Sequence, residues 1–393
     1  MKRMLWIIFM MAIGTTFPTP LFPIYQEQFH LSNLEITLLF AVYAIFLLPS
    51  LLAAGQLGTR YGIKKITMVG IFASIMSVIL FIIGTSAWQL YLSRILEGIG
   101  FGLFMGTATT LLLKKSPKGM TAKALTLSSM GIMVGFGVGP AISGLIIQYI
   151  QVQQLRFPFE VLFVLLISAA ISLVTITDKQ SLKNKKQPMR IKIEVPQHIR
   201  ANFWSFIGLT GFTVFTLNGI VISIIPTYVK TVLHTSNLAI SGLLILLLLG
   251  GGGLAQRISW PHQPVSRIRI GISLQLIGAW LMVIAGISSN IVIIWMGIFI
   301  QAIGGGWSFQ ASLQLAGIAP KPEERSSVIS AYYFTSYSGF IIPIVGVGLL
   351  NLFFDLSQSL TILNATATII VIMLVVLSFK PSILKLGNRN TKY

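Results

Sequence analysis

The sequence has no cysteine among its 393 residues, which excludes a disulfide framework and any thiolate metal or redox site. Charged residues are also scarce: they make up 9% of the chain, against about a quarter in soluble globular domains. Hydrophobic residues make up 54%. Many uncharged runs are long enough to cross a bilayer as a helix, and they do not alternate in the manner of membrane barrel strands. The composition therefore predicts an all-α integral membrane protein.

Catalytic signatures are lacking as well. The sequence contains no Gly-x-Ser-x-Gly elbow, no His-Glu-x-x-His pair, no phosphate-binding Walker loop and no carboxylate cluster. The few histidines all fall in predicted loops: His30, His198, His234 and His262. We therefore expect neither an enzyme nor a metal site, and no cofactor. Since the sequence lacks a nucleotide-binding loop for hydrolysis, an ion gradient is the remaining common source of energy.

The hydrophobic runs predict twelve membrane-spanning helices. The first run, from Met4 to Tyr25, lacks a clear cleavage site, and we interpret it as a helix rather than a signal peptide. The other predicted helices cover 35–58, 66–86, 88–113, 122–150, 158–177, 203–229, 237–257, 266–288, 290–317, 325–352 and 358–379. The long polar interval 178–202 divides them into two six-helix bundles, 1–177 and 203–379, followed by a tail, 380–393.

The basic residues predict the orientation. With this helix count, all of the 28 lysines and arginines except Arg94, Arg156 and Lys230 fall on the side of the N-terminus. The positive-inside rule therefore predicts cytoplasmic N- and C-termini in the plasma (inner) membrane. The net charge of +19 then reflects loops that face anionic lipid headgroups, without any need for a nucleic-acid partner.

The two predicted bundles share short motifs about 200 residues apart, which indicates an internal duplication. The matching pairs are Pro23-Ile24-Tyr25 with Pro226-Thr227-Tyr228, Glu97 with Gln301, Gly100 with Gly304, Gly102 with Gly306, Pro140 with Pro343, and Gly55–Arg60 with Gly252–Arg257. Parallel repeats of this kind place a substrate site between the halves, near the middle of the bilayer.

Two charged residues, Arg94 and Glu97, lie clearly inside a predicted helix. Charge within a membrane is costly, so each is a functional candidate. At positions i and i+3 they share a helix face and can pair. Two interpretations stay open: a structural pair that neutralises itself, or a carboxylate that loads and releases a proton beside the arginine.

Uncharged polar residues are more numerous in the predicted helices, and some are candidates for lining a cavity: Thr15, Thr16, Asn218, Gln301, Gln310, Tyr333 and Tyr337. For any one of them a hydrogen bond between helices is an equally good interpretation. Taken together, they favour an apolar or weakly polar solute over a multiply charged one.

A stripe of glycines marks the predicted helix 122–150. Gly131, Gly135 and Gly139 recur every four residues, so another backbone can approach closely, and Pro140 should bend the helix. The stripe is either a static packing face or a surface against which a neighbouring helix rocks.

Three motifs resemble those of the major facilitator superfamily. The segment Gly55-Gln-Leu-Gly-Thr-Arg60-Tyr-Gly62-Ile-Lys64 is similar to the family's loop between helices 2 and 3, with Thr59 in place of the usual Asp. Arg94 with Gly98, Gly100 and Gly102 resembles the helix 4 motif, in which Glu97 stands where Gln is commoner. Gly135, Gly139, Pro140 and Gly144 resemble the helix 5 motif of the antiporter branches.

The resemblance implies a twelve-helix transporter that exports a small molecule in exchange for protons, like the drug–proton antiporters. Arg94 and Glu97 would couple protons, and Gly55, Arg60, Gly62 and Lys64 would serve a cytoplasmic gate. The expected partners are a small-molecule substrate, protons and the lipid bilayer, with the protein acting as a monomer. Alternatives are an uptake symporter or facilitator for a sugar or metabolite, a transporter of lipid-like amphiphiles, and a non-transporting sensor or intramembrane enzyme.

Overall fold

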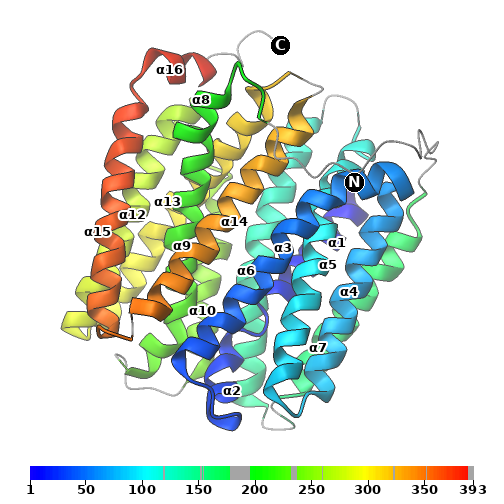
Figure 1. Cartoon of the computed structure of the whole chain (residues 1–393), viewed down its shortest axis with the longest axis vertical. Helices are drawn as coiled ribbons and strands as arrows, with labels where there is room; N and C mark the ends of the chain where they lie inside the picture. Colours follow the sequence, from blue (N-terminus) through cyan, green and yellow to red (C-terminus); the bar gives the residue numbers. More distant parts are fainter. Residues whose placement is uncertain are drawn as a thin grey trace. The chain divides into compact units, whose positions relative to one another are not determined.

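The chain folds into helices joined mostly by short connections, as a computed structural model shows (Figure 1). The structure describes residues 1–117, 120–150, 153, 155–177, 195–231, 237–258, 260–321, 324–350 and 352–387. These residues contain no β-strand, so the predicted all-α class is confirmed. Of the predicted linker and tail, 178–194 and 388–393 lie outside the described residues.

Twelve helices in this part of the chain are long and apolar enough to cross a bilayer, which confirms the predicted number. The first six spans contain α1 (Lys2–Thr16), η1 (Thr19–Leu21), α2 (Phe22–Gln28), α3 (Asn33–Tyr61), α4 (Ile63–Ile83), α5 (Ala87–Lys114), α6 (Thr121–Tyr149) and α7 (Phe157–Val174). The other six contain α8 (Arg200–Asn202), η2 (Phe203–Ile207), α9 (Gly208–Thr231), α10 (Leu238–Ile245), η3 (Leu246–Gly251), α11 (Gly252–Ala255), α12 (Pro264–Ser288), α13 (Ile291–Ile318), α14 (Arg325–Leu350) and α15 (Leu356–Leu377). A short helix, α16 (Pro381–Gly387), lies in the predicted tail.

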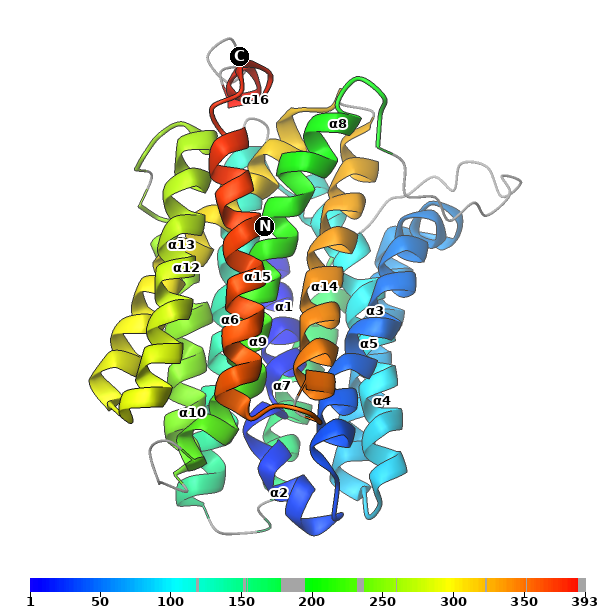
Figure 2. The ribbon, with the colours of Figure 1, turned by 60° about the vertical axis from the view of Figure 1, so that its left-hand side comes forward.

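Residue contacts divide the chain into two compact units. The first contains Met1–Lys192 and Asn237–Leu246, and the second contains Ile193–Ser236 and Leu247–Tyr393. In the first unit, α1 packs against α6 and α7, and α5 packs against α3 and α4. In the second unit, α9 lies beside α14 and α15 (Figure 2), and α12 packs along α13. The helix α10 groups with the first unit because it packs on α6.

Prolines interrupt the first span, which the sequence predicts as one helix over 4–25. The structure corrects this: α1 ends at Thr16, and a single 3-10 turn precedes α2. Pro18, Pro20 and Pro23 lack the amide hydrogen that a continuous helix needs. The segment therefore forms three consecutive helical pieces, α1, η1 and α2. The pieces still make one span, Lys2–Gln28.

The predicted division of the long uncharged run at Ser288-Ser289-Asn290 is confirmed. The helix α12 ends at Ser288, and Ser289 has φ 49°, a left-handed conformation that stops a helix. The side chain of Asn290 then accepts a hydrogen bond from the Val292 amide at 2.9 Å and caps α13.

Matching glycine contacts in the two units support the internal duplication. A Cβ atom added at Gly70 in α4 would lie 2.7 Å from the carbonyl oxygen of Gly100 in α5. One added at Gly271 in α12 would lie 2.7 Å from the carbonyl oxygen of Gly304 in α13. Each unit thus brings its third and fourth spans into backbone contact through equivalent glycines.

Candidate functional site

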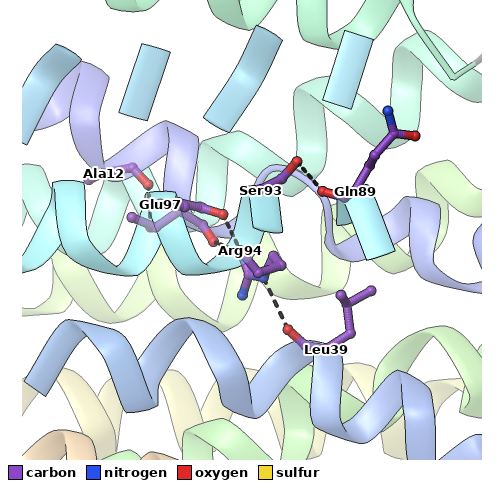
Figure 3. Close-up of polar contacts among 7 residues, drawn as sticks. Ala12, Leu39, Gln89, Ser93, Arg94 and Glu97 are labelled. Atoms are coloured by element: carbon purple, nitrogen blue, oxygen red, sulfur yellow. Dashed lines mark hydrogen bonds and ion pairs between the residues drawn. The ribbon is translucent and has the colours of Figure 1, made fainter. Parts of the chain in front are cut away.

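The charged pair predicted from the sequence lies in the first half of α5 and is buried. Arg94 is 3% exposed and Glu97 is 5% exposed. One turn of helix separates them, so the Nη1 atom of Arg94 reaches the Oε2 atom of Glu97 at 2.5 Å. Arg94 also donates from Nε to the Leu39 carbonyl of α3 at 3.2 Å (Figure 3). It donates from Nη1 to the Thr15 carbonyl of α1 at 3.4 Å. The guanidinium therefore joins three spans of the first unit.

Two aromatic rings complete the surroundings of Arg94. Its Cζ atom lies 4.6 Å from the centre of the Tyr43 ring in α3 and 5.9 Å from that of Phe22 in α2. Ring faces attract a desolvated cation, so they offset part of the cost of burying the guanidinium. Arginine suits this position better than lysine because its planar fork can bind several partners and stack on a ring together.

The carboxylate of Glu97 is only half satisfied. Its Oε2 atom is bound to Arg94, whereas its Oε1 atom is buried without a hydrogen-bond partner. Beside it lies a small cavity within the first unit, bounded by side chains of α1, α4, α5 and α7. Its polar side chains are Thr15, Ser74, Ser77 and Glu97, and the rest of its wall is apolar.

The predicted cavity residues of α1 have their hydroxyl groups bound to backbone. Thr15 donates to the Ala12 carbonyl at 2.9 Å, and Thr16 donates to the Phe136 carbonyl of α6 at 2.7 Å. Thr16 thus makes a hydrogen bond between helices, whereas Thr15 makes one within its own helix. Sequence reasoning missed Ser74 and Ser77, because serines inside an apolar helix carry no periodic signal of their own.

The motif predicted for the fifth span lies in α6, and its residues fall on two faces of that helix. On one face, a Cβ at Gly135 would lie 2.6 Å from the Ala12 Cβ, and one at Gly139 would overlap the Ile13 carbonyl oxygen, both in α1. On the other face, a Cβ at Gly144 would lie 2.8 Å from the Leu238 carbonyl of α10.

Pro140 lies on this second face. Its carbonyl would be overlapped by a Cβ at Gly242 of α10. Gly131, the first residue of the predicted stripe, faces open space instead. The motif therefore joins α1 and α10 through different residues, a division that its spacing alone does not show.

The predicted gate residues lie at the junction of α3 and α4. Gly62 has φ 102°, a conformation that L side chains rarely adopt, and it allows α4 to start directly where α3 ends. Lys64 donates from Nζ to the Val174 carbonyl at the end of α7, at 2.9 Å. Arg60 lies over the Tyr61 ring, 5.4 Å from its centre, and a Cβ at Gly55 would meet no atom within 4 Å.

Thr59, which stands where the motif that it resembles has an acid, donates its hydroxyl to the Gly55 carbonyl of its own helix at 2.7 Å. A hydroxyl group used in this way carries no charge and cannot form the ion pairs of an aspartate. The loop thus keeps its turn geometry and its cations without the acidic group.

Buried amides occupy the corresponding part of the second unit. Gln275 of α12 donates to the Asn218 side chain of α9 at 3.0 Å, and Gln301 of α13 donates to the Leu217 carbonyl at 3.0 Å. Gln301 matches Glu97 in the internal repeat, so an amide stands where the first unit has a carboxylate. Sequence reasoning missed Gln275, although the match of Gly70 with Gly271 would have pointed to its helix.

The remaining predicted residues of the second unit are also engaged or buried. Gln310 accepts a hydrogen bond from Arg267 Nη1 at 3.0 Å. Tyr333 and Tyr337 of α14 are 7% and 4% exposed, and the Tyr337 ring lies 5.1 Å from that of Phe215. The contacts of Gln310 and Tyr337 therefore lie within the second unit.

Comparison with known proteins identifies the family. The sequence profile of the Major Facilitator Superfamily matches residues 4–344, most of the chain. The chain belongs to the major facilitator superfamily. It is therefore a multi-pass protein of a family of membrane transporters. The resemblance of the three motifs is confirmed at the level of the family.

Several relatives of this superfamily member are named for drug resistance. Multidrug resistance protein 2 of Bacillus subtilis (strain 168) is 30% identical over 175 residues, 44% of this chain and 42% of the relative. Multidrug resistance protein 1 of the same strain is 28% identical over 214 residues, 53% and 54% of the two chains. Quinolone resistance protein NorA of Staphylococcus aureus (strain MRSA252) is 30% identical over 137 residues, 35% of each chain. The chain thus matches about half or less of the length of these relatives.

Solved structures show the same fold over nearly the whole length. A POT family transporter in complex with 5-aminolevulinic acid superposes with a TM-score of 0.79, covering 97% of this chain and 96% of the other. The sequences are 13% identical, so the likeness concerns the fold alone.

Proposed function

We propose that this superfamily member is a secondary active transporter that exports a small, amphipathic or weakly polar molecule in exchange for protons, by alternating access of two six-helix bundles. It acts in the plasma (inner) membrane as a monomer, with both termini in the cytoplasm. The named relatives support export of drug-like molecules, since they are called multidrug and quinolone resistance proteins.

The buried Arg94–Glu97 pair carries the proposal. An ionisable group inside a membrane protein is costly, so a buried one is a candidate for a functional role. Glu97 has one oxygen bound to Arg94 and one oxygen free, so a proton can bind without displacing the arginine. Protonation cancels the charge of the carboxylate and weakens its ion pair with Arg94 inside α5. The same guanidinium binds backbone carbonyls of α3 and α1, so a proton on Glu97 changes the charge balance of a side chain that contacts three spans.

The residues of the second unit support a weakly polar substrate. Its buried polar groups are mostly uncharged amides and hydroxyl groups, such as those of Asn218, Gln301 and Tyr337, and Arg267 is the only charged side chain among the buried residues described there. Such groups suit neutral or singly charged molecules. A multiply charged substrate would need compensating charges.

The test is proton flux in liposomes that contain the purified protein and a pH-sensitive dye. A pH gradient is imposed, and lipophilic cations, neutral antibiotics, acids and sugars are added in turn. We expect a lipophilic cation or neutral antibiotic to dissipate the gradient in the exchange direction. Flux in the symport direction, or movement of a sugar without protons, would contradict proton-coupled export.

Glu97→Gln is expected to abolish proton movement, because the amide accepts no proton at physiological pH, while binding of the substrate persists. Glu160→Gln is the matched control: Glu160 lies exposed in the first turn of α7 and should be neutral to transport. Undiminished coupling in Glu97→Gln would show that Glu97 has no part in it.

A further inference from the structure

The cavity beside Glu97 has the size and chemistry of a site for one water molecule. It offers about 10 Å³ to the centre of a water molecule, which is room for roughly one. Two of its polar atoms, Glu97 Oε1 and Ser77 Oγ, are buried and have no hydrogen-bond partner. Buried polar atoms are rarely left unpaired, because each loses its hydrogen bonds to water on folding.

The remaining groups of the wall complete the set of partners that a water needs. Ser74 donates its proton to the Gly70 carbonyl at 3.2 Å, so its oxygen is left as an acceptor. A water can then donate to Glu97 Oε1 and to Ser74 Oγ and accept from Ser77 Oγ, which satisfies both unpaired atoms. Glu97 is the only ionisable side chain among the described residues of the wall, and Arg94 occupies its other oxygen.

Aromatic rings enclose one side of the cavity. Phe81 of α4 and Phe159 of α7 both line it and stack in parallel, with ring centres 4.5 Å apart. The ring of Tyr25 also packs on Phe81, with ring centres 6.4 Å apart, and the ring of Phe17 packs on Phe159, with ring centres 5.9 Å apart. This side of the cavity is therefore walled by packed aromatic rings.

We propose that this cavity binds a single water, hydrogen-bonded to Glu97, Ser77 and Ser74, through which a proton reaches Glu97 from within the first unit. When a proton reaches the water, the water takes it up at its oxygen as it releases another proton to Glu97 Oε1, so that it stays neutral and no hydroxide forms. Ser77 is a positioning residue, since it acts through the water. The relay role rests on the proposed proton coupling, whereas the water site does not.

The test of the site is X-ray hydroxyl-radical footprinting of the purified protein in nanodiscs, read by mass spectrometry. Radicals formed from a bound water oxidise the side chains that touch it even when these are buried. Met11 lines the cavity, and Met4 of the same helix does not; they are 1% and 0% exposed. We expect several-fold more oxidation at Met11 than at Met4. When the protein is transferred to ¹⁸O-labelled water, we also expect the label to appear slowly in oxidised Met11, because the bound water exchanges slowly. Equal oxidation of the two methionines would overturn the site.

Variants of Ser77 test the partners. Ser77→Val fills the cavity and should reduce Met11 oxidation to the level of Met4, and Ser77→Ala removes only the hydroxyl group and should lower it partially. Ser93→Ala is the control, because Ser93 is equally buried and bonds to the Gln89 carbonyl of its own helix at 2.8 Å. Full oxidation in both Ser77 variants would place the water elsewhere.

Proton flux in the same variants tests the relay. Ser77→Val is expected to slow proton exchange several-fold while leaving substrate binding unchanged, and Ser93→Ala should do neither. Unaltered flux in a variant that has lost the footprint would make the water structural and refute the relay. A wild-type protein that keeps the footprint but moves no protons would refute the proposed coupling instead.

Discussion

At the scale of single residues, the buried ion pair of the first unit is costly to form. Arg94 and Glu97 are both almost completely buried, and removing two charges from water is expensive unless each finds its partners. Arg94 finds them in the Glu97 carboxylate, two backbone carbonyls and two rings. Glu97 depends on Arg94 alone among the described residues, so the two residues should behave as a unit.

This interdependence predicts a non-additive pair of substitutions. Arg94→Met should lower the free energy of unfolding by about 3–5 kcal/mol, because it strands a buried carboxylate. The double variant Arg94→Met with Glu97→Met should recover most of that loss, since both charges are then gone. Thermal unfolding in detergent measures both effects. Equal destabilisation by the single and double variants would contradict the pairing.

At the scale of elements, α6 shows how one glycine motif serves two neighbours. Gly135 and Gly139 allow α1 to approach, whereas Gly144 lies against α10. The glycines that face a backbone leave no room for a methyl group, whereas Gly131 has no neighbour within 4 Å of its added Cβ. The same residue type thus carries different constraints along one helix.

The contrast predicts opposite outcomes for two alanine substitutions in α6. Gly139→Ala should destabilise the protein by about 1–3 kcal/mol, the usual cost of overpacking a filled interface. Gly131→Ala should be neutral or stabilising by up to about 1 kcal/mol, because alanine favours the helix. The melting temperatures of the two variants test this contrast. An unchanged melting temperature in Gly139→Ala would show that α1 can move away from α6 at little cost.

At the scale of the whole molecule, the basic residues predict a single orientation in the membrane. The lysines and arginines gather in loops on one predicted side, and the positive-inside rule turns this asymmetry into cytoplasmic termini. Since the chain has no cysteine, single cysteines can report the side of each loop without background.

The orientation can be checked with a membrane-impermeant maleimide on intact cells. Thr85→Cys, in the connection between α4 and α5, should react from outside, because that connection is predicted to face outward. Lys380→Cys, just after α15, should react only after the cells are permeabilised. Both positions are exposed, so access of the reagent depends on the membrane alone. The reverse pattern of labelling would invert the topology.

The sequence by itself determined the number of spans, the helical class and the family motifs. These follow from local properties: run length, the scarcity of charge, and turn residues such as Ser289 and Asn290, which act within a few residues of themselves. The pairing of Arg94 with Glu97 was predictable for the same reason, since helix geometry fixes the distance between i and i+3. The prolines after Thr16 were visible as well, although the single helix predicted there ignored them.

Only the tertiary structure decided which spans meet. It placed Gly139 against α1 and Gly144 against α10, left Gly131 open, and put the Thr15 and Thr16 hydroxyls onto backbone carbonyls. It also brought Ser77 into one cavity with Glu97, although the two lie on different helices. Such contacts depend on how side chains of several helices fill a common volume, and in a chain that is apolar all along its helices, no periodicity marks which face will be covered by which neighbour.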